Sequence, residues 1–406
     1  MLPVVVLILV LAVTIYLTQK GYQLYWGLLG GSVLLSIANG NGLISTAQIF
    51  GKALAAPKTL ELVIAVTIVS IMTSVMSSSN LLERMVARLS DFFNNPKLTL
   101  MGIPALVGGI PVTGGAIMSA PLVGQIGASL ALSNARMAAV NIIFRHVSIW
   151  VLPFRPNYLL AASLSAIPLF DLVKAQASFT VLGFLVGYWF LLREAQAKEE
   201  QQGQKANRLL AGRDFLIYSS PLSIILVVSA FGLRLDLSLF LGLILCMFFA
   251  WGHPNFKFQS VIKGIRPDLI MTMVSIIVFA KAVHSIEVLP NLLNSVVSYG
   301  IPFNLLVFLV PLVVGYLTAD ITTCVALVFP LLLPLVPVET KLYYVVAFYA
   351  TGMISYMISP LHMCQVLTND HFGINLFQIY REYWAVQLAL LAGIITFFFL
   401  GIYWLG

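Results

Sequence analysis

The chain has 406 residues, of which 60% are apolar and only 9% are charged, and its mean hydropathy is +0.98. In soluble domains about a quarter of the residues are charged and cover the surface, so this composition excludes a string of soluble domains. The formal net charge of +7 comes with no basic run interleaved with aromatics, and we expect no nucleic-acid partner.

The apolar segments have the lengths of membrane-crossing helices, since about 20 apolar residues span a hydrocarbon core roughly 30 Å thick. In chain order, the predicted segments are 2–18, 22–39, 60–78, 98–130, 136–166, 176–193, 216–233, 237–252, 268–286, 302–337, 341–375 and 378–404. The first segment has no basic leader and no A-x-A cleavage site, which indicates a retained helix. We therefore predict an all-α polytopic membrane protein that lies in a lipid bilayer.

The two halves of the chain repeat the same order of features on either side of a hydrophilic stretch, residues 194–214. A shift of 209 residues places Thr113 on Thr322, and a shift of 207 places Pro153 on Pro360. We predict that 194–214 is a cytoplasmic linker between two repeats, residues 1–193 and 215–406. The expected parts of each repeat are a scaffold (1–95 and 215–300), a re-entrant hairpin (98–130 and 302–337) and a Pro-broken helix (136–166 and 341–375).

Charge placement favours one topology for these repeats. With about five crossings and one hairpin in each half, the repeats are inverted, and a cytoplasmic linker puts fourteen Lys and Arg residues inside and five outside. This is the positive-inside bias of a multi-pass protein, here expected in the cell inner (plasma) membrane. It predicts ten crossings with both termini outside. A topology in which the long segments cross twice reverses several loops and stays open.

Four interruptions of the apolar segments are placed symmetrically: the two hairpin tips, and the helix breaks at Pro153 and Pro360. Hydrocarbon cannot bond to free backbone groups, so such breaks occur only where they line a cavity or are buried in protein. Helix N-termini at breaks suit an anion, and exposed carbonyl and hydroxyl oxygens suit Na⁺. The sequence therefore predicts a binding site where the four breaks meet.

Glycine and threonine dominate both hairpin tips. Glycine lets the backbone approach a ligand, and a threonine hydroxyl can donate to a carboxylate or coordinate Na⁺. The tip residues that we expect to bind substrate are Thr113, Gly114, Gly115, Thr318, Thr322 and Thr323. Small residues also allow membrane helices to pack closely, and at any single position this alternative stays open.

Asp320 is the one acidic residue near the centre of a predicted membrane segment. Insertion scales put the cost of such a charge at about 3 kcal/mol, so it needs a function or a partner. We expect Asp320, with Thr322 and Thr113, to hold a coupling cation. A structural ion pair with Arg155 or Arg145, and a place in a water-filled vestibule, are the alternatives.

Arg155 follows the break at Pro153 directly and lies near the middle of its broken helix. A guanidinium at that depth is costly unless it is paired, and its planar fork suits a carboxylate or phosphate. We expect Arg155 to be the main charge partner of an anionic substrate. Arg145 and His146 lie nearly three turns earlier, and for them a role on the substrate path, a structural ion pair and snorkelling all stay open.

His362 takes the place of Arg155 in the second half and is expected to bind substrate or to carry a proton. A hydrogen-bonded packing role is the alternative. Asn157 is a further substrate-binding candidate. Polar residues expected to line the same site are Ser148, Ser355, Thr368 and Asn369.

Motifs of hydrolytic and ATP-driven enzymes are missing from the sequence: it has no HExxH, no GxSxG and no P-loop. Asp320 has no second embedded acid in a matching motif, as an aspartyl intramembrane protease requires. The three cysteines lie in apolar segments without CxxC spacing, so we expect neither disulfides nor a zinc site. We expect no enzyme and no cofactor, and the only metal that we expect is a coupling Na⁺.

With hairpin, broken helix and closing helix appearing twice in inverted order, the chain resembles the ion transporter superfamily. The resemblance is to a bacterial and archaeal branch distantly related to the divalent anion:sodium symporters, gluconate permeases and large TRAP subunits. The symporters carry Ser-Asn-Thr at both tips; here the tips read Pro-Val-Thr-Gly-Gly (111–115) and Thr-Ala-Asp-Ile-Thr-Thr (318–323), so only Thr113 and Thr322 match. The resemblance implies a homodimer in which a transport domain moves as an elevator against a scaffold.

These observations predict a secondary active transporter of a small, carboxylate-like organic anion, coupled to Na⁺ or H⁺. A cation/proton antiporter is the alternative, with Asp320 as the shared ion site and Arg155 as its structural partner. A channel or a membrane scaffold is a third class, but neither needs two half-membrane hairpins.

Overall fold

Proline is the first residue of several helices of this chain, where its missing N–H donor costs no hydrogen bond, and Gly373 ends a helix in a left-handed conformation. The computed structural model describes residues 2–93, 95–109, 115–196, 207–286 and 302–404. Every regular element among these residues is a helix, and none is a strand. The predicted all-α architecture is confirmed for this part of the chain.

The first half of the chain contains α1 (Leu2–Gln19), α2 (Leu24–Ala38), α3 (Leu43–Ala55), α4 (Pro57–Ser78), α5 (Leu81–Phe93), α6 (Pro96–Gly109), α7 (Gly115–Ser129), α8 (Asn134–Val147), η1 (Ser148–Val151), α9 (Pro156–Ser165), α10 (Leu169–Gly187) and η2 (Tyr188–Leu192). The second half contains α11 (Arg208–Ala230), α12 (Leu235–Ala250), α13 (Gln259–Gly264), α14 (Pro267–His284), α16 (Phe303–Thr318), α17 (Ile321–Leu332), η3 (Leu333–Leu335), α18 (Lys341–Ile358), α19 (Met363–Phe372) and α20 (Leu376–Trp404).

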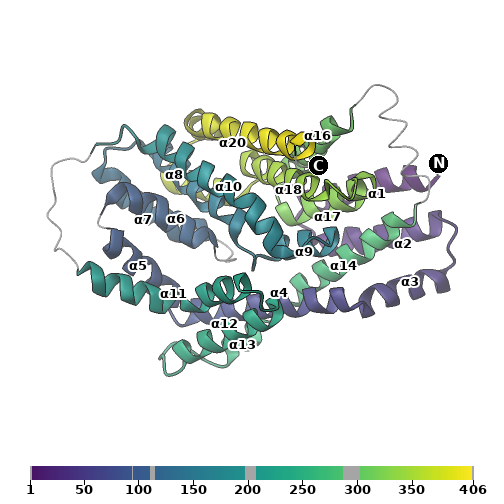
Figure 1. The fold of residues 1–406 in the computed structure, drawn as a ribbon, viewed down its shortest axis with the longest axis horizontal. Helices are drawn as coiled ribbons and strands as arrows, with labels where there is room; N and C mark the ends of the chain where they lie inside the picture. Colours follow the sequence, from purple (N-terminus) through teal and green to yellow (C-terminus); the bar gives the residue numbers. More distant parts are fainter. Residues whose placement is uncertain (1, 94, 110–114, 197–206, 287–301, 405–406) are drawn as a thin grey trace.

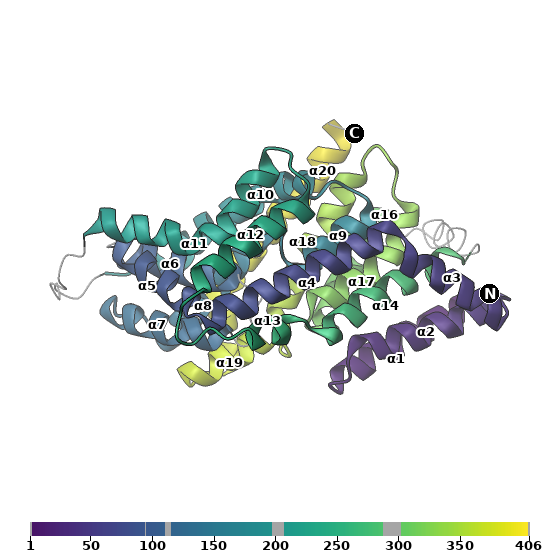
Figure 2. The ribbon, with the colours of Figure 1, turned by 90° about the horizontal axis from the view of Figure 1, so that it is seen from below.

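The helices form two groups (Figure 1). The core bundle comprises α6–α10 and α16–α20, in which α6 packs on α8, α16 on α18, and α10 on α20. The flanking layer comprises α1–α5 and α11–α14, in which α1 and α14 pack on α2, α11 on α5, and α12 on α4. Figure 2 shows α5 and α11 at one end of the long axis and α1–α3 at the other. The groups meet through α5 on α6, α4 on α9, and α14 on α17.

Within the core bundle, the helices of the two halves interlock. The second short helix of each predicted hairpin packs on the broken helix of the other half: α7 lies on α19, and α17 lies on α9. Each half therefore completes the other. The middle of the bundle is formed by segments that lie some 200 residues apart in sequence.

The helices of the core bundle begin at a constant offset. In four pairs of helices the first residues are 207 residues apart: α6 and α16, α8 and α18, α9 and α19, and α10 and α20. Ala166 and Gly373, which end α9 and α19 in left-handed conformations, keep the same offset. Pro104 and Pro311 keep it inside α6 and α16. This regularity underlies the two-repeat proposal made below.

Seven helical segments among the described residues have the length and hydropathy to cross a membrane, which supports a multi-pass membrane protein. They are Leu2–Gln19, Pro57–Ser78, Asn134–Ser165, Leu169–Leu192, Arg208–Ser229, Lys341–Phe372 and Leu376–Trp404. Shorter apolar helices include α2, α12 and α16, together with α17 and its continuation η3.

The structure differs from the sequence predictions in the length of the linker and in one additional helix, α3. The predicted linker 194–214 is shorter, because Asn207 caps α11 by accepting from the N–H groups of Leu209 and Leu210, so the chain is helical from Arg208 on. Helix α3 was missing from the predicted segments, since its polar residues interrupt the apolar run. Residues 287–300 of the predicted scaffold 215–300 lie outside the described residues.

Candidate functional site

Two helix breaks lie at equivalent places in the core bundle. Helix α8 ends at Val147 and α9 begins at Pro156, after a 3₁₀ turn; α18 ends at Ile358 and α19 begins at Met363. The predicted breaks at Pro153 and Pro360 are confirmed. Arg155 and His362 are the residues that cap the N-termini of α9 and α19. Both therefore lie where a helix presents free N–H groups and its positive end.

Arg155 lies half-buried at the first break. Its Nη1 donates to the carbonyl oxygen of Gly108, 2.7 Å away, which ties α9 to the end of α6. Its Nε is buried and has no hydrogen-bond partner among the described residues. The guanidinium also interacts electrostatically with Tyr356, Tyr349 and Arg145. One edge of the fork is thus fixed, while another donor is left for a ligand.

Arg145 is more deeply placed, with 5% of its surface exposed. Its Nη1 has no hydrogen-bond partner within the described ranges. Neither Arg145 nor Arg155 has a carboxylate within 4.0 Å in the part of the chain that the structure describes. The structural ion pair considered for Arg145, and the pairing of Asp320 with either arginine, are not found there.

Two histidines and a tyrosine pack against each other beside these arginines. The ring centroids of His146 and His362 are 4.8 Å apart, and those of Tyr356 and His362 are 4.1 Å apart. Tyr356 also interacts electrostatically with Arg155, Asp320 and other charged groups of the site. Both histidines are buried, and neither ring nitrogen of His362 has a hydrogen-bond partner among the described residues.

The second hairpin places Asp320 at the start of α17. Its Oδ1 accepts from the backbone N–H of Thr323 at 2.6 Å and from the Thr323 hydroxyl at 2.8 Å, which is the geometry of a helix N-cap. Thr318 is buried, and its hydroxyl donates to the carbonyl of Val314 at 2.8 Å. Thr322 is half-buried on the first turn of α17. Asp320 thus has a structural role whether or not it binds a cation.

Asn157 is the second residue of α9 and is buried. Its amide donates to the Tyr349 hydroxyl at 2.7 Å, which joins the two broken helices. Asn141 donates in the same way to Thr368 at 2.9 Å. These amides lock the core bundle together, and Asn157 reaches the site through its contact with Tyr349.

The first hairpin tip can be placed only in part. Thr113 and Gly114 lie outside the described residues, and Gly115 is the first residue of α7. Tyr356 and Tyr349 are site residues that the sequence reasoning missed. Nothing in their spacing in the sequence marks them as site residues.

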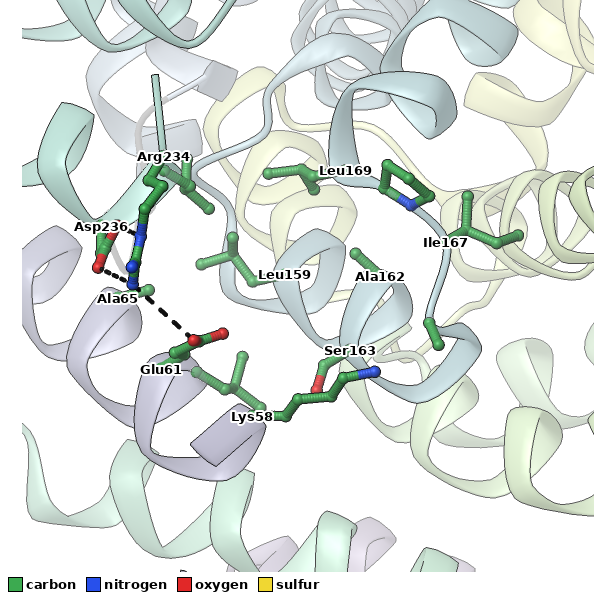
Figure 3. A pocket seen from close by; sticks show the side chains of 14 residues that line it. Lys58, Glu61, Ala65, Leu159, Ala162, Ser163, Ile167, Leu169, Arg234 and Asp236 are labelled. Carbon is green, nitrogen blue, oxygen red and sulfur yellow. Dashed lines mark hydrogen bonds and ion pairs between the residues drawn. The ribbon is translucent and has the colours of Figure 1, made fainter. Parts of the chain in front are cut away.

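A cavity of about 400 Å³ lies between the flanking layer and the core bundle, and neither Arg155 nor His362 lines it (Figure 3). Helix α4 forms one wall, and α9 with its connection to α10 forms the other. Arg234 at its edge contacts Asp236 at 2.8 Å and Glu61 at 4.0 Å. Leu159, Ala162 and other apolar side chains line the interior. Helix α9, which lines the cavity, begins at the break that contains Arg155.

The comparisons with known proteins identify a family. The model of the family described as "Protein of unknown function (DUF401)" matches residues 2–402 of the chain. A search of curated proteins finds no match. Because the family model covers nearly the whole chain, this protein belongs to the DUF401 family.

Proposed function

We propose that this protein is a secondary active transporter of a small, carboxylate-like organic anion. The observation that carries the proposal is the pair of guanidiniums, Arg145 and Arg155, at a break in the middle of the core bundle. Each has a buried donor nitrogen without a partner among the described residues. A carboxylate accepts such donors in a planar, charge-assisted arrangement that few other ligands match.

Helix N-termini add to this preference for an anion. The caps of α9 and α19 are Arg155 and His362, so the free N–H groups of both helices begin beside the two arginines. Each helix end contributes a partial positive charge. A substrate carboxylate bound there offsets the cost of keeping two guanidiniums in a low-dielectric core.

The constant 207-residue offset supports two repeats, as does a pair of equivalent hydrogen bonds, and the odd number of crossings expected in each half makes them inverted. Ser148 Oγ donates to the carbonyl of Ala105, and Ser355 Oγ donates to that of Leu312. In each bond the serine and its acceptor are 43 residues apart in sequence. In the proposed arrangement the core bundle is the transport domain and the flanking layer is the scaffold. The transport domain moves across the bilayer as an elevator, in a homodimer joined by the scaffolds.

The direction of the chain in the membrane is proposed from charge. Ten crossings, a cytoplasmic linker and external termini agree with the bias of Lys and Arg toward one side. On this assignment Lys58 and Arg234 lie outside, and the cavity between α4 and α9 opens on the outer side. Movement of α9 along α4 then changes the wall of that cavity.

Coupling to a cation is proposed at the second hairpin. Asp320 Oδ1 is engaged in the cap of α17, and its half-buried carboxylate has no ion pair within the described ranges. With the Thr322 hydroxyl and nearby carbonyls, it offers hard oxygen ligands for Na⁺, or a site for H⁺.

The experiment that tests this function is a thermal melt of the detergent-purified protein against a panel of organic anions, each with Na⁺ or with choline. A ligand at about 100 times its Kd adds roughly 2.7 kcal/mol to the native state. We expect one class of anion to raise the melting temperature, with a larger shift when the coupling cation is present. Shifts with Na⁺ or pH alone, and none with any anion, would instead support a cation/proton antiporter.

A further inference from the structure

Three side chains that can bind a metal meet at the centre of the core bundle, although His146 is far from His362 and Cys364 in sequence. A ring nitrogen of His146, one of His362 and the Cys364 sulfur all lie within 4.8 Å of one another. His146 comes from α8, and the other two come from the break before α19 and its first turn. Both histidines are buried, each with 1% of its surface exposed.

We propose that His146, His362 and Cys364 form a binding site for a soft d¹⁰ metal ion such as Cu⁺, Ag⁺ or Zn²⁺. This inference goes beyond the proposed transport function and does not depend on it. Imidazole nitrogen together with a thiolate is the donor set that such ions prefer, whereas Na⁺, Mg²⁺ and Ca²⁺ prefer oxygen.

The hydrogen bonds of His146 leave one of its ring nitrogens ready to bind. Its Nδ1 lies 2.7 Å from the carbonyl oxygen of Ile142, one turn earlier in α8. A carbonyl can only accept, so Nδ1 carries the proton and Nε2 of the neutral ring carries the lone pair. A backbone carbonyl that orients a ligating histidine in this way is the usual outer partner of a protein metal site.

His362 is the second independent sign of a ligand. Neither of its ring nitrogens forms a hydrogen bond of acceptable geometry with any described residue. The carbonyl of Met357 is nearby, but it does not meet the distance and angle limits of a hydrogen bond either. Buried polar groups in proteins are nearly always bonded, so two partnerless nitrogens on one buried ring call for an explanation. A metal bound at one nitrogen supplies it, with the Met357 carbonyl available to the other.

The geometry is close to that of a metal centre. Bonds of about 2.0 Å to nitrogen and 2.3 Å to sulfur place tetrahedral ligand atoms roughly 3.3 to 3.8 Å apart. The three atoms, at 4.8 Å or less, close around an ion with about 1 Å of side-chain movement. With three protein ligands, a tetrahedral ion keeps a fourth coordination position for another ligand.

Charge favours a monovalent ion. Arg145 interacts electrostatically with both histidines, so a dication would add to positive charge that is already buried. A Cu⁺ or Ag⁺ ion bound by the Cys364 thiolate adds no net charge, because the thiol proton leaves as the metal enters. Zn²⁺ bound in the same way adds one unit.

The test uses the full-length protein in detergent with Cys246 and Cys324 replaced by Ser, so that Cys364 is the only thiol of the chain. Ag⁺, which is stable to air, and Co²⁺, a coloured stand-in for Zn²⁺, are titrated without any organic anion. Bound metal is counted by mass spectrometry after gel filtration, and the thiolate-to-Co²⁺ absorption band is recorded. His362→Gln and His146→Gln are compared with His371→Gln, whose histidine is exposed on the same helix α19.

We expect one Ag⁺ per chain, and a loss of affinity of about tenfold or more for each of the two ligand variants. His371→Gln should bind as the parent does, and melting curves of all variants establish that they are folded. Co²⁺ binding at a lower affinity is expected from the charge argument. The proposal is overturned if neither ion binds stoichiometrically, or if binding to Cys364 is indifferent to both histidines.

Discussion

Ser148 and Ser355 make the same hydrogen bond in the two halves of the core bundle. Each hydroxyl donates to a backbone carbonyl 43 residues earlier, that of Ala105 at 2.9 Å in the first half and that of Leu312 in the second. The first bond joins α6 to the start of η1, directly after α8, and the second joins α16 to the last turn of α18. If the halves are repeats, removing either bond should have the same kind of effect.

We therefore predict that Ser148→Ala and Ser355→Ala lower the stability of the protein by similar amounts, about 0.5–1.5 kcal/mol each. The hydroxyl is lost and a carbonyl in the bundle loses a partner. Apparent melting temperatures in detergent measure the effect, with Ser178→Ala on the outer face of α10 as the control. A loss confined to one of the two serines would count against equivalent structural roles.

Close helix packing in each half depends on a glycine at the same offset, Gly108 in α6 and Gly315 in α16. A Cβ on Gly108 would lie 1.9 Å from the carbonyl oxygen of Arg145, and one on Gly315 would lie 2.9 Å from that of Gly352. The contact atoms are backbone, so the helices must move apart. Gly108→Ala should thus destabilise by about 1–3 kcal/mol or more, and Gly315→Ala by less.

Gly30→Ala is the matched control for these two variants, since nothing lies within 4 Å of the added Cβ. Alanine is the better helix former by about 1 kcal/mol, so this variant should melt at or above the parent temperature. Gly108→Ala should also disturb anion binding, because Arg155 donates to the Gly108 carbonyl. Normal melting of Gly108→Ala would contradict the close approach of α6 and α8.

Much of this architecture can be predicted from the sequence because its causes are local. Pro153 and Pro360 predict the helix breaks, since proline removes a donor and clashes with the preceding turn. The role of Asp320 as a cap was not predicted, because its bond to Thr323 exists only once α17 begins there. Tyr356 was missed for a different reason: its neighbours come from both halves of the chain, and no local pattern records them.

Asp320 has two separable roles, the N-cap of α17 and the proposed cation site. Asparagine preserves a cap but not the charge, whereas alanine removes both. Asp320→Asn should keep the melting temperature and lose the effect of the coupling cation. Asp320→Ala should also lose about 0.5–2 kcal/mol of stability. Melts with Na⁺ or choline, across pH, separate the roles; a full cation response in Asp320→Asn would remove the carboxylate from the coupling site.

The cavity between α4 and α9 offers a test of movement between the two groups of helices. Ala162 lies on α9 within its lining, so Ala162→Trp fills space that the proposed sliding of α9 along α4 requires. We expect anion uptake into proteoliposomes to fall at least about tenfold, while anion affinity in detergent stays unchanged.

The control for this variant is Val181→Trp, on an exposed face of α10. It introduces the same tryptophan side chain where no helix of the described chain has to pass, and its uptake should remain close to that of the parent. Equal uptake by Ala162→Trp and the parent would show that the cavity does not change during transport.

The central claim is that Arg155 holds the charge of the substrate anion at the break between α8 and α9. The most direct measurement is the equilibrium Kd of the anion identified by the melting panel, for the parent, Arg155→Ala and the exposed-arginine control Arg381→Ala. A hydrogen bond to a charged group contributes about 1.5–3 kcal/mol, which corresponds to roughly 10- to 150-fold in Kd. We predict a loss of this size in folded Arg155→Ala and none in Arg381→Ala. Unchanged affinity in a folded Arg155→Ala variant would contradict the account.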